Sequence, residues 1–179
     1  MADLDNTLDL AKKNGFTHVS ALDPNTLILM PEVRDMCSVN SCGMYDKNWS
    51  CPPSCGTLEE CRQEISSYHC GILVQTMGKL EDAFDFDAMM ELEDRHKKNF
   101  LRFRVVLADD YPKLLALGSG PCTLCKECTY PDASCRFPEK SVSSMEAYGL
   151  LVNQICTDND MLYYYGPNTM AYTSCYLLE

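Results

Sequence analysis

The chain has 179 residues and a formal net charge of −11, from 26 acidic and 15 basic side chains. This acidity disfavours nucleic acid as a partner, because phosphate backbones attract basic surfaces. No apolar stretch approaches the 18 or so residues of a membrane span, and the length suits one domain over residues 1–179. The twelve cysteines are several times the usual share.

The first thirty residues predict a helix followed by a hairpin. Apolar residues recur at helical spacing in residues 3–14, and Asn14-Gly15 supplies a stop. Residues 16–22 are typical of a strand, and residues 26–30 of a second short strand after the turn at 23–25.

The middle of the chain mixes strands and helices. Thr57 and Glu60 form a capping box that opens a helix to about Tyr68, and residues 71–77 form a buried apolar strand. Residues 86–108 carry the longest helical pattern, with apolar side chains every three or four positions.

The last third predicts one more helix and three short strands. The strands fall at residues 114–117, 161–165 and 169–177, and the helix runs from Ser143 or Ser144 to about Cys156. Together the elements predict an α+β fold, with a small mixed sheet, packed helices and two cysteine-rich metal-binding loops at 37–55 and 122–135.

The later loop, CTLCKECTYPDASCRFP, carries the most informative spacing. Cys122, Cys125 and Cys128 follow a C-x2-C-x2-C pattern, and Cys135 comes after six further residues. Three thiolates this close together suit the corners of a [4Fe–4S] cluster better than a disulfide or a tetrahedral zinc ion. The fourth cysteine departs from the ferredoxin pattern, because the gap is longer and arginine follows it. Zinc therefore stays open as an alternative.

The earlier loop contains a second set of candidate ligands, Cys37, Cys42, Cys51 and Cys55, with Cys55 the weakest member. Their gaps match no common zinc pattern. Glycine next to Cys42 lets the backbone approach a cluster, and prolines after Cys51 stiffen the loop. The two loops predict one or two clusters, and the spacing leaves open whether they pool their ligands.

The cysteines cluster in two short zones instead of spreading along the chain, which disfavours a secreted disulfide framework. The N-terminal sequence also has no signal-peptide pattern. We therefore expect a reducing cytoplasmic location, because clustered thiols would otherwise oxidise.

Three segments carry a resemblance to known proteins: MCSVNSCGMYDKNWSCPPSCGTLEEC, FDFDAMM with His96 after it, and CTLCKECTYPDASCRFPEKSVSSMEAYGL. Over roughly residues 30–175 the chain resembles a bacterial and archaeal family of predicted metal-binding proteins, found mainly in anaerobes. The resemblance implies metal binding and iron–sulfur content, without a known reaction. The ligands that it implies are Cys37, Cys42 and Cys51 in one zone and Cys122, Cys125, Cys128 and Cys135 in the other.

Other polar residues have two interpretations each. His96 lies on the apolar face of its helix, either as a hydrogen-bonded core residue or as a proton carrier beside a cluster. Asp85 and Asp87 cap a helix more often than they do acid–base chemistry. Arg136 either stabilises charge at a cluster or pairs with Glu139. Cys61, Cys70, Cys156 and Cys175 lie in regular elements and are expected to pack as small apolar side chains.

The function predicted from these features is electron transfer by one or two [4Fe–4S] clusters to a partner oxidoreductase, with homo-oligomerisation open. The acidic surface would steer docking. One alternative is an enzyme in which an iron with only three cysteine ligands is open to substrate. Another is a zinc-stapled interaction module without redox activity.

Overall fold

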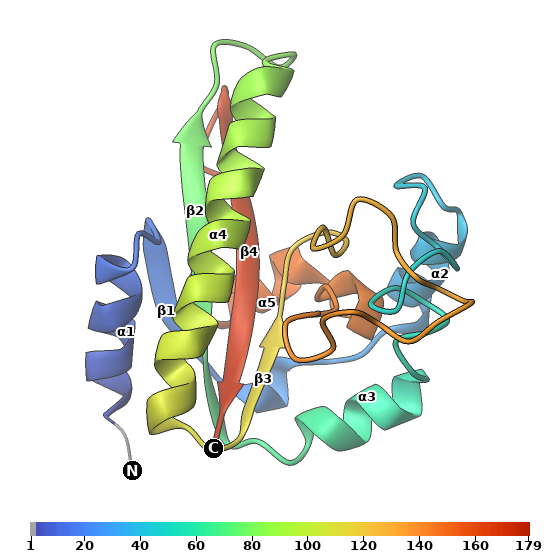
Figure 1. Ribbon diagram of the computed structural model, residues 1–179. Coiled ribbons are helices and arrows are strands. Elements are labelled where there is room, and N and C mark those ends of the chain that lie inside the picture. The colour runs from blue at the N-terminus through green and yellow to red at the C-terminus, as the bar shows by residue number, and fades with distance from the viewer. Residues whose placement is uncertain (1–2) are drawn as a thin grey trace.

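The computed structural model describes residues 3–179, which fold into one antiparallel sheet covered on both faces (Figure 1). The strands are β1 (His18–Leu22), β2 (Cys70–Lys79), β3 (Leu114–Leu117) and β4 (Thr169–Leu178). The helices are α1 (Leu4–Lys13), α2 (Pro31–Ser38), α3 (Leu58–Ile65), α4 (Phe86–Asp110) and α5 (Val152–Asp158), with 3-10 turns η1 (Pro24–Thr26) and η2 (Glu146–Tyr148). The α+β class is confirmed.

The sheet has the order β1-β2-β4-β3, and every strand pairing in it is antiparallel instead of mixed. The two long central strands pair over their whole length, from Cys70 opposite Leu178 to Lys79 opposite Thr169. Because successive side chains of a strand point to opposite faces, these two strands supply apolar residues to both sides of the sheet.

One face of the sheet is covered by α4 and α1 (Figure 1). Phe100, Phe103 and Leu107 of α4 pack on Ile72 and Tyr176 of the central strands. The aromatic rings are in direct contact, with the Phe100 and Tyr176 centroids 4.8 Å apart. Burial of one such side chain contributes about 2 kcal/mol, so this layer holds α4 firmly against the sheet.

The opposite face is covered by α3, α5, η2 and the segment that leads into α2. Its core includes Leu73, Cys175 and Leu177 from the sheet, with Met145 and Cys156 above them. Cys61, Cys156 and Cys175 are buried and free, and Cys70 is half-buried, so these four cysteines pack in the fold as expected.

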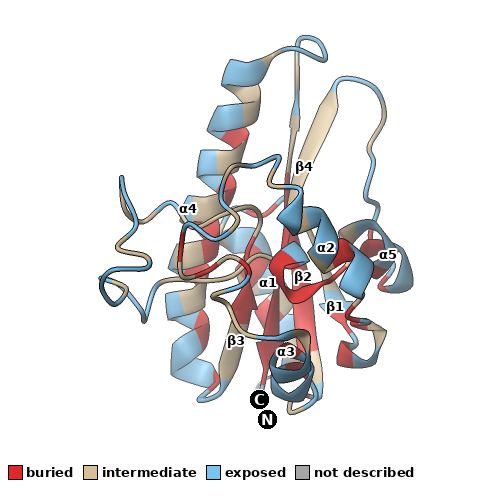
Figure 2. Ribbon diagram, turned by 90° about the vertical axis from the view of Figure 1, so that its right-hand side faces the viewer, coloured by how far each residue is buried: buried red, intermediate tan, exposed pale blue. Residues whose placement is uncertain are grey.

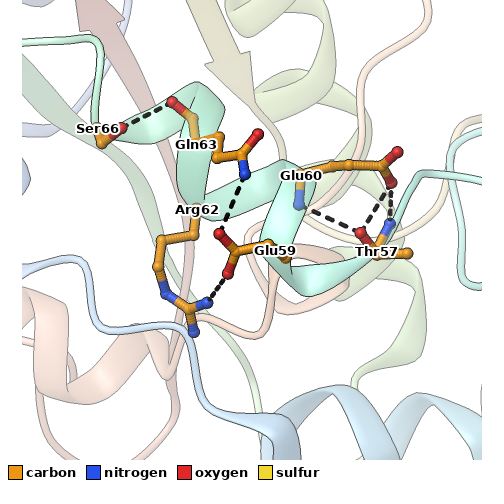
Figure 3. Close-up of polar contacts among 6 residues, drawn as sticks. All are labelled: Thr57, Glu59, Glu60, Arg62, Gln63 and Ser66. Carbon is orange, nitrogen blue, oxygen red and sulfur yellow. Dashed lines mark hydrogen bonds and ion pairs between the residues drawn. The ribbon is translucent and has the colours of Figure 1, made fainter.

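The capping box of α3 is confirmed (Figure 3). The Glu60 N–H donates to Thr57 Oγ1 over 3.2 Å, and the Thr57 N–H donates to Glu60 Oε2 over 2.6 Å. Glu59 then accepts from Arg62 over 2.6 Å and from Gln63 over 3.1 Å. These local contacts fix where the chain leaves the first cysteine loop and turns into α3.

The predicted hairpin near the N-terminus is wrong. Pro24 begins a 3-10 turn capped by Asp23, and Pro31 begins α2, so residues 26–30 contribute only a single bridge, from Leu29 to Leu150. The partner of β1 is instead β2, from a distant part of the sequence.

Two predictions in the last third are also wrong. The helix expected from Ser143 is broken at Gly149, which adopts a left-handed φ of +76° between η2 and α5. A Cβ there would meet the Met30 carbonyl oxygen at 2.9 Å, so the chain needs glycine at this close approach. Residues 161–165 form no strand, and β4 is the only strand after α5 in the described chain.

Both cysteine loops lie to one side of the sheet, next to α2 (Figure 1). The first follows α2, the second follows β3, and much of both is exposed or partly exposed (Figure 2). Across residues 3–179, no helix combines the length and the apolar composition that crossing a membrane requires.

Candidate metal centre

The first cysteine zone begins in the last turn of α2 with Cys37 and continues through a tightly turned loop. Asn40 and Gly43 have left-handed φ values of +59° and +71°, and the Gly43 N–H donates to the Asn40 carbonyl over 3.0 Å. These reversals bring the chain back on itself, so that three thiols lie near one another.

Cys37, Cys42 and Cys51 form this group. Burial raises the pKa of Cys37, and the neighbouring Cys42 and Cys51 thiols raise it further. Burial also raises the pKa of Cys51, and there the nearby polar side chains of Asn48 and Ser50 oppose the increase. As thiolates these three groups would repel one another and a bound cation would relieve that repulsion, although the described residues 3–179 place no three of them to hold a single ion.

Cys55 lies beside a basic side chain of α2. Its Sγ lies 3.4 Å from Arg34 Nη2, which also donates to the Gly56 carbonyl, while Arg34 Nη1 lies 4.0 Å from Cys61 Sγ. Burial raises the pKa of Cys55 to about 11, although the Arg34 charge opposes this increase. Cys55 thus contacts Arg34 next to Cys61, while the Cys51 thiol also raises the pKa of Cys55, so it lies at the edge of the first zone.

The four cysteines of the second zone all line one pocket. We call this the thiol pocket; its walls include Cys122, Cys125, Cys128 and Cys135, together with Asn48 and Trp49 from the first loop. The backbone around it forms few internal bonds: between Cys122 and Cys135, only the Ala133 N–H donates to another described residue. The other N–H groups are available to sulfur acceptors or to water.

The two loops pack directly on each other. The Trp49 indole N–H donates to the Ala133 carbonyl over 3.1 Å, and its ring meets Tyr130 edge-on at 4.9 Å. The Tyr130 hydroxyl in turn donates to Asp46 over 2.5 Å. The Cys122 thiol also raises the pKa of Cys51, so the two zones approach each other at these residues.

The chain matches a family described as predicted metal-binding protein (DUF2284) over residues 20–178. This chain belongs to that family. No curated protein and no solved structure matches the chain. The metal-binding interpretation of the cysteine zones therefore agrees with the family description, while the identity of the metal and of its ligands stays a prediction.

The donor set fits the metal that the family description implies. Thiolates are soft ligands that favour zinc, copper(I) and iron–sulfur clusters. In the part of the chain that the structure describes, no three His, Cys, Asp or Glu side chains are placed to hold a single ion. The thiols of the second zone instead surround a pocket, with the buried, unpartnered Asn48 Nδ2 in its wall.

His96 is a core residue. Its ring nitrogens are paired with Thr76 Oγ1 at 2.8 Å and Ser174 Oγ at 2.7 Å, and the side chain is 1% exposed. Burial lowers the pKa of His96 to about 3, assisted by the charge of Lys97. A histidine that stays neutral at physiological pH is a poor proton carrier, although it lines a pocket whose wall also includes Cys122.

The other polar candidates have local roles. Asp85 accepts from the Ala88 N–H over 3.2 Å and so caps α4, as expected. Arg136 lines the thiol pocket and donates to the Glu127 carbonyl over 2.7 Å, so it braces the loop. Glu146 lies near enough to Cys37 for its charge to raise the pKa of that thiol.

Two residues of the site carried no signal in the sequence. Arg34 lies in α2, where a basic residue on an exposed helix is ordinary, and its contact with Cys55 depends on the path of the loop. Asn48 lies in a loop rich in polar residues, where an asparagine usually makes a turn. Only the folded loops show that its amide is buried beside the thiols.

Proposed function

We propose that this protein holds iron–sulfur clusters in its two cysteine zones and transfers single electrons to a partner oxidoreductase. The observation that carries the proposal is the arrangement of the four thiols of the second zone around one pocket, against the loop that holds the other three. When bound, such clusters supply reversible one-electron chemistry over a wide range of potentials.

The proposed ligands divide by zone. Cys122, Cys125, Cys128 and Cys135 hold one cluster, and Cys37, Cys42 and Cys51 hold the other, in line with the grouping of their thiols. Trp49 of the first loop holds the two loops together, because it donates to the Ala133 carbonyl and packs against the Tyr130 ring.

The surface of the loops supports exchange of electrons with a partner. Cys42 and Cys128 are the exposed cysteines, one in each zone, so each proposed cluster has an edge near solvent. Met36, Val39 and Met44 are exposed apolar side chains beside the first zone. With a net charge of −11, the protein would be steered toward a basic docking surface.

One observation favours a second candidate, an enzyme with a cluster iron open to substrate. Cys55 Sγ accepts from Arg34 over 3.4 Å, and with that contact kept only Cys37, Cys42 and Cys51 would remain as ligands in the first zone. A small anion or thiol that perturbs the optical spectrum of the metal-loaded protein would support this candidate, and no perturbation would favour the carrier.

The ligand assignment is tested by substituting Cys125→Ser, with Cys70→Ser as the matched control. Cys70 is half-buried in β2, and its thiol donates to the Leu178 carbonyl over 3.2 Å, a bond that serine retains. We expect Cys125→Ser to lose about four irons per chain, the content of one cubane cluster, and Cys70→Ser to lose none. An iron content that is the same in both variants contradicts the assignment.

A further inference from the structure

The side chain of Asn48 is buried between the two cysteine zones, at 3% exposure. Its carbonyl end is fully engaged: Oδ1 accepts from the Ser50 N–H over 3.0 Å and from the Ser50 hydroxyl over 2.8 Å. A flipped amide would place its NH2 group against the Ser50 N–H, donor against donor, so these contacts fix which end of the amide faces which way.

The nitrogen end has no such partner. Asn48 Nδ2 is buried and makes no hydrogen bond to any residue from Asp3 to Glu179. An amide NH2 carries two donors, and leaving both unpaired away from water destabilises the folded protein. A buried donor kept at this cost points to an acceptor that forms only when a metal is bound.

The surroundings of Asn48 Nδ2 indicate what the acceptor is. Asn48 forms part of the wall of the thiol pocket, together with all four cysteines of the second zone. Sulfur of a bound metal centre is a good acceptor, because metal coordination leaves the thiolate negatively charged.

We propose that Asn48 Nδ2 donates a hydrogen bond to metal-bound thiolate sulfur of the second zone, in the thiol pocket. Asn48 is thus a positioning residue that tunes the cluster proposed for that zone. The inference rests on the proposed function, and it assigns to one residue the control of reduction potential. Hydrogen bonds to cluster sulfur stabilise the more negative, reduced state and raise the potential.

Three variants separate the donor from the rest of the side chain. Asn48→Asp retains an oxygen for the two Ser50 bonds and removes the N–H donors, whereas Asn48→Leu removes the donors without adding charge. Ser20→Ala is the matched control, because it removes another buried polar group that has no hydrogen-bond partner among the described residues, on β1 and outside both cysteine zones. The full-length, metal-loaded proteins are compared in reductive titrations and in the rate at which a chelator removes the metal.

We expect both Asn48 variants to bind metal at the wild-type stoichiometry, with a more negative reduction potential and loss of metal to the chelator about tenfold faster. Ser20→Ala should match the wild type in both measurements. Unchanged potential and unchanged release in Asn48→Leu overturn the inference while leaving the proposed function intact. A wild-type protein that holds no metal instead overturns the proposed function, and the inference falls with it.

Discussion

The buried His96 makes a quantitative prediction about stability and pH. Its imidazole is held neutral between Thr76 and Ser174, with a pKa lowered to about 3 by burial. In the unfolded chain the same ring regains its ordinary pKa of about 6.5. Between these two values the unfolded state binds a proton that the folded state does not. The contribution of His96 to the free energy of unfolding is therefore complete above pH 6.5 and is lost as the pH falls toward 3.

The magnitude follows from the linkage relation. Each pH unit in this window costs about 1.4 kcal/mol, and the 1.5 units from pH 6.5 to pH 5 cost about 2 kcal/mol of unfolding free energy. Carboxylates also titrate near pH 5, so the wild type alone does not isolate the effect. Replacing His96→Gln removes the titrating group and retains an amide that can reach Thr76 and Ser174.

The assay is urea unfolding of wild type and His96→Gln at pH 7.5 and pH 5. The variant loses ring contacts with Phe16 and Phe100, and this constant cost is the same at both pH values. Metal release at low pH affects both proteins alike. We expect the wild type to lose about 2 kcal/mol more than the variant between the two pH values. Equal losses would refute the assignment of a neutral, buried His96.

Three further substitutions test the packing around the site. Thr57→Ala removes the cap of α3 and should lower the unfolding free energy by about 1 kcal/mol, measured in urea, whereas no change would show that the capping box contributes nothing. Gly149→Ala places a Cβ at a φ of +76° against the Met30 carbonyl, so we expect a loss above about 1 kcal/mol in the same assay; a wild-type value contradicts the close approach. Trp49→Ala removes a hydrogen bond and an aromatic contact worth about 2 kcal/mol together, and proteolysis in the second loop should become at least about tenfold faster. Trp49→Phe keeps an aromatic ring and should show a smaller effect. Proteolysis at the wild-type rate in both variants would mean that the packing of the two loops does not depend on Trp49.

The sequence predicts those parts of the fold whose signals are local. The capping box of Thr57 and Glu60 and the apolar period of residues 86–108 each depend on side chains a few positions apart, and both elements form as expected. The spacing of Cys122, Cys125 and Cys128 is also local, and the structure places these thiols on one pocket.

The parts that sequence reasoning missed depend on distant contacts. Leu27 and Leu29 alternate like a strand, but Pro24 and Pro31 on either side confine them to a connection that packs under η2. Gly149 breaks a helix because the Met30 backbone lies against it, a neighbour more than a hundred positions away. Arg34 and Asn48 likewise acquire their roles only after the two loops meet.

The most direct test of the account is the iron, sulfide and zinc content of wild-type protein purified without oxygen, together with its optical spectrum. The account predicts about eight irons and eight sulfides per chain, with a broad absorption that bleaches on reduction, as for two cubane clusters. Colourless protein that holds one or two zinc ions would contradict the electron-transfer proposal and leave a structural metal module.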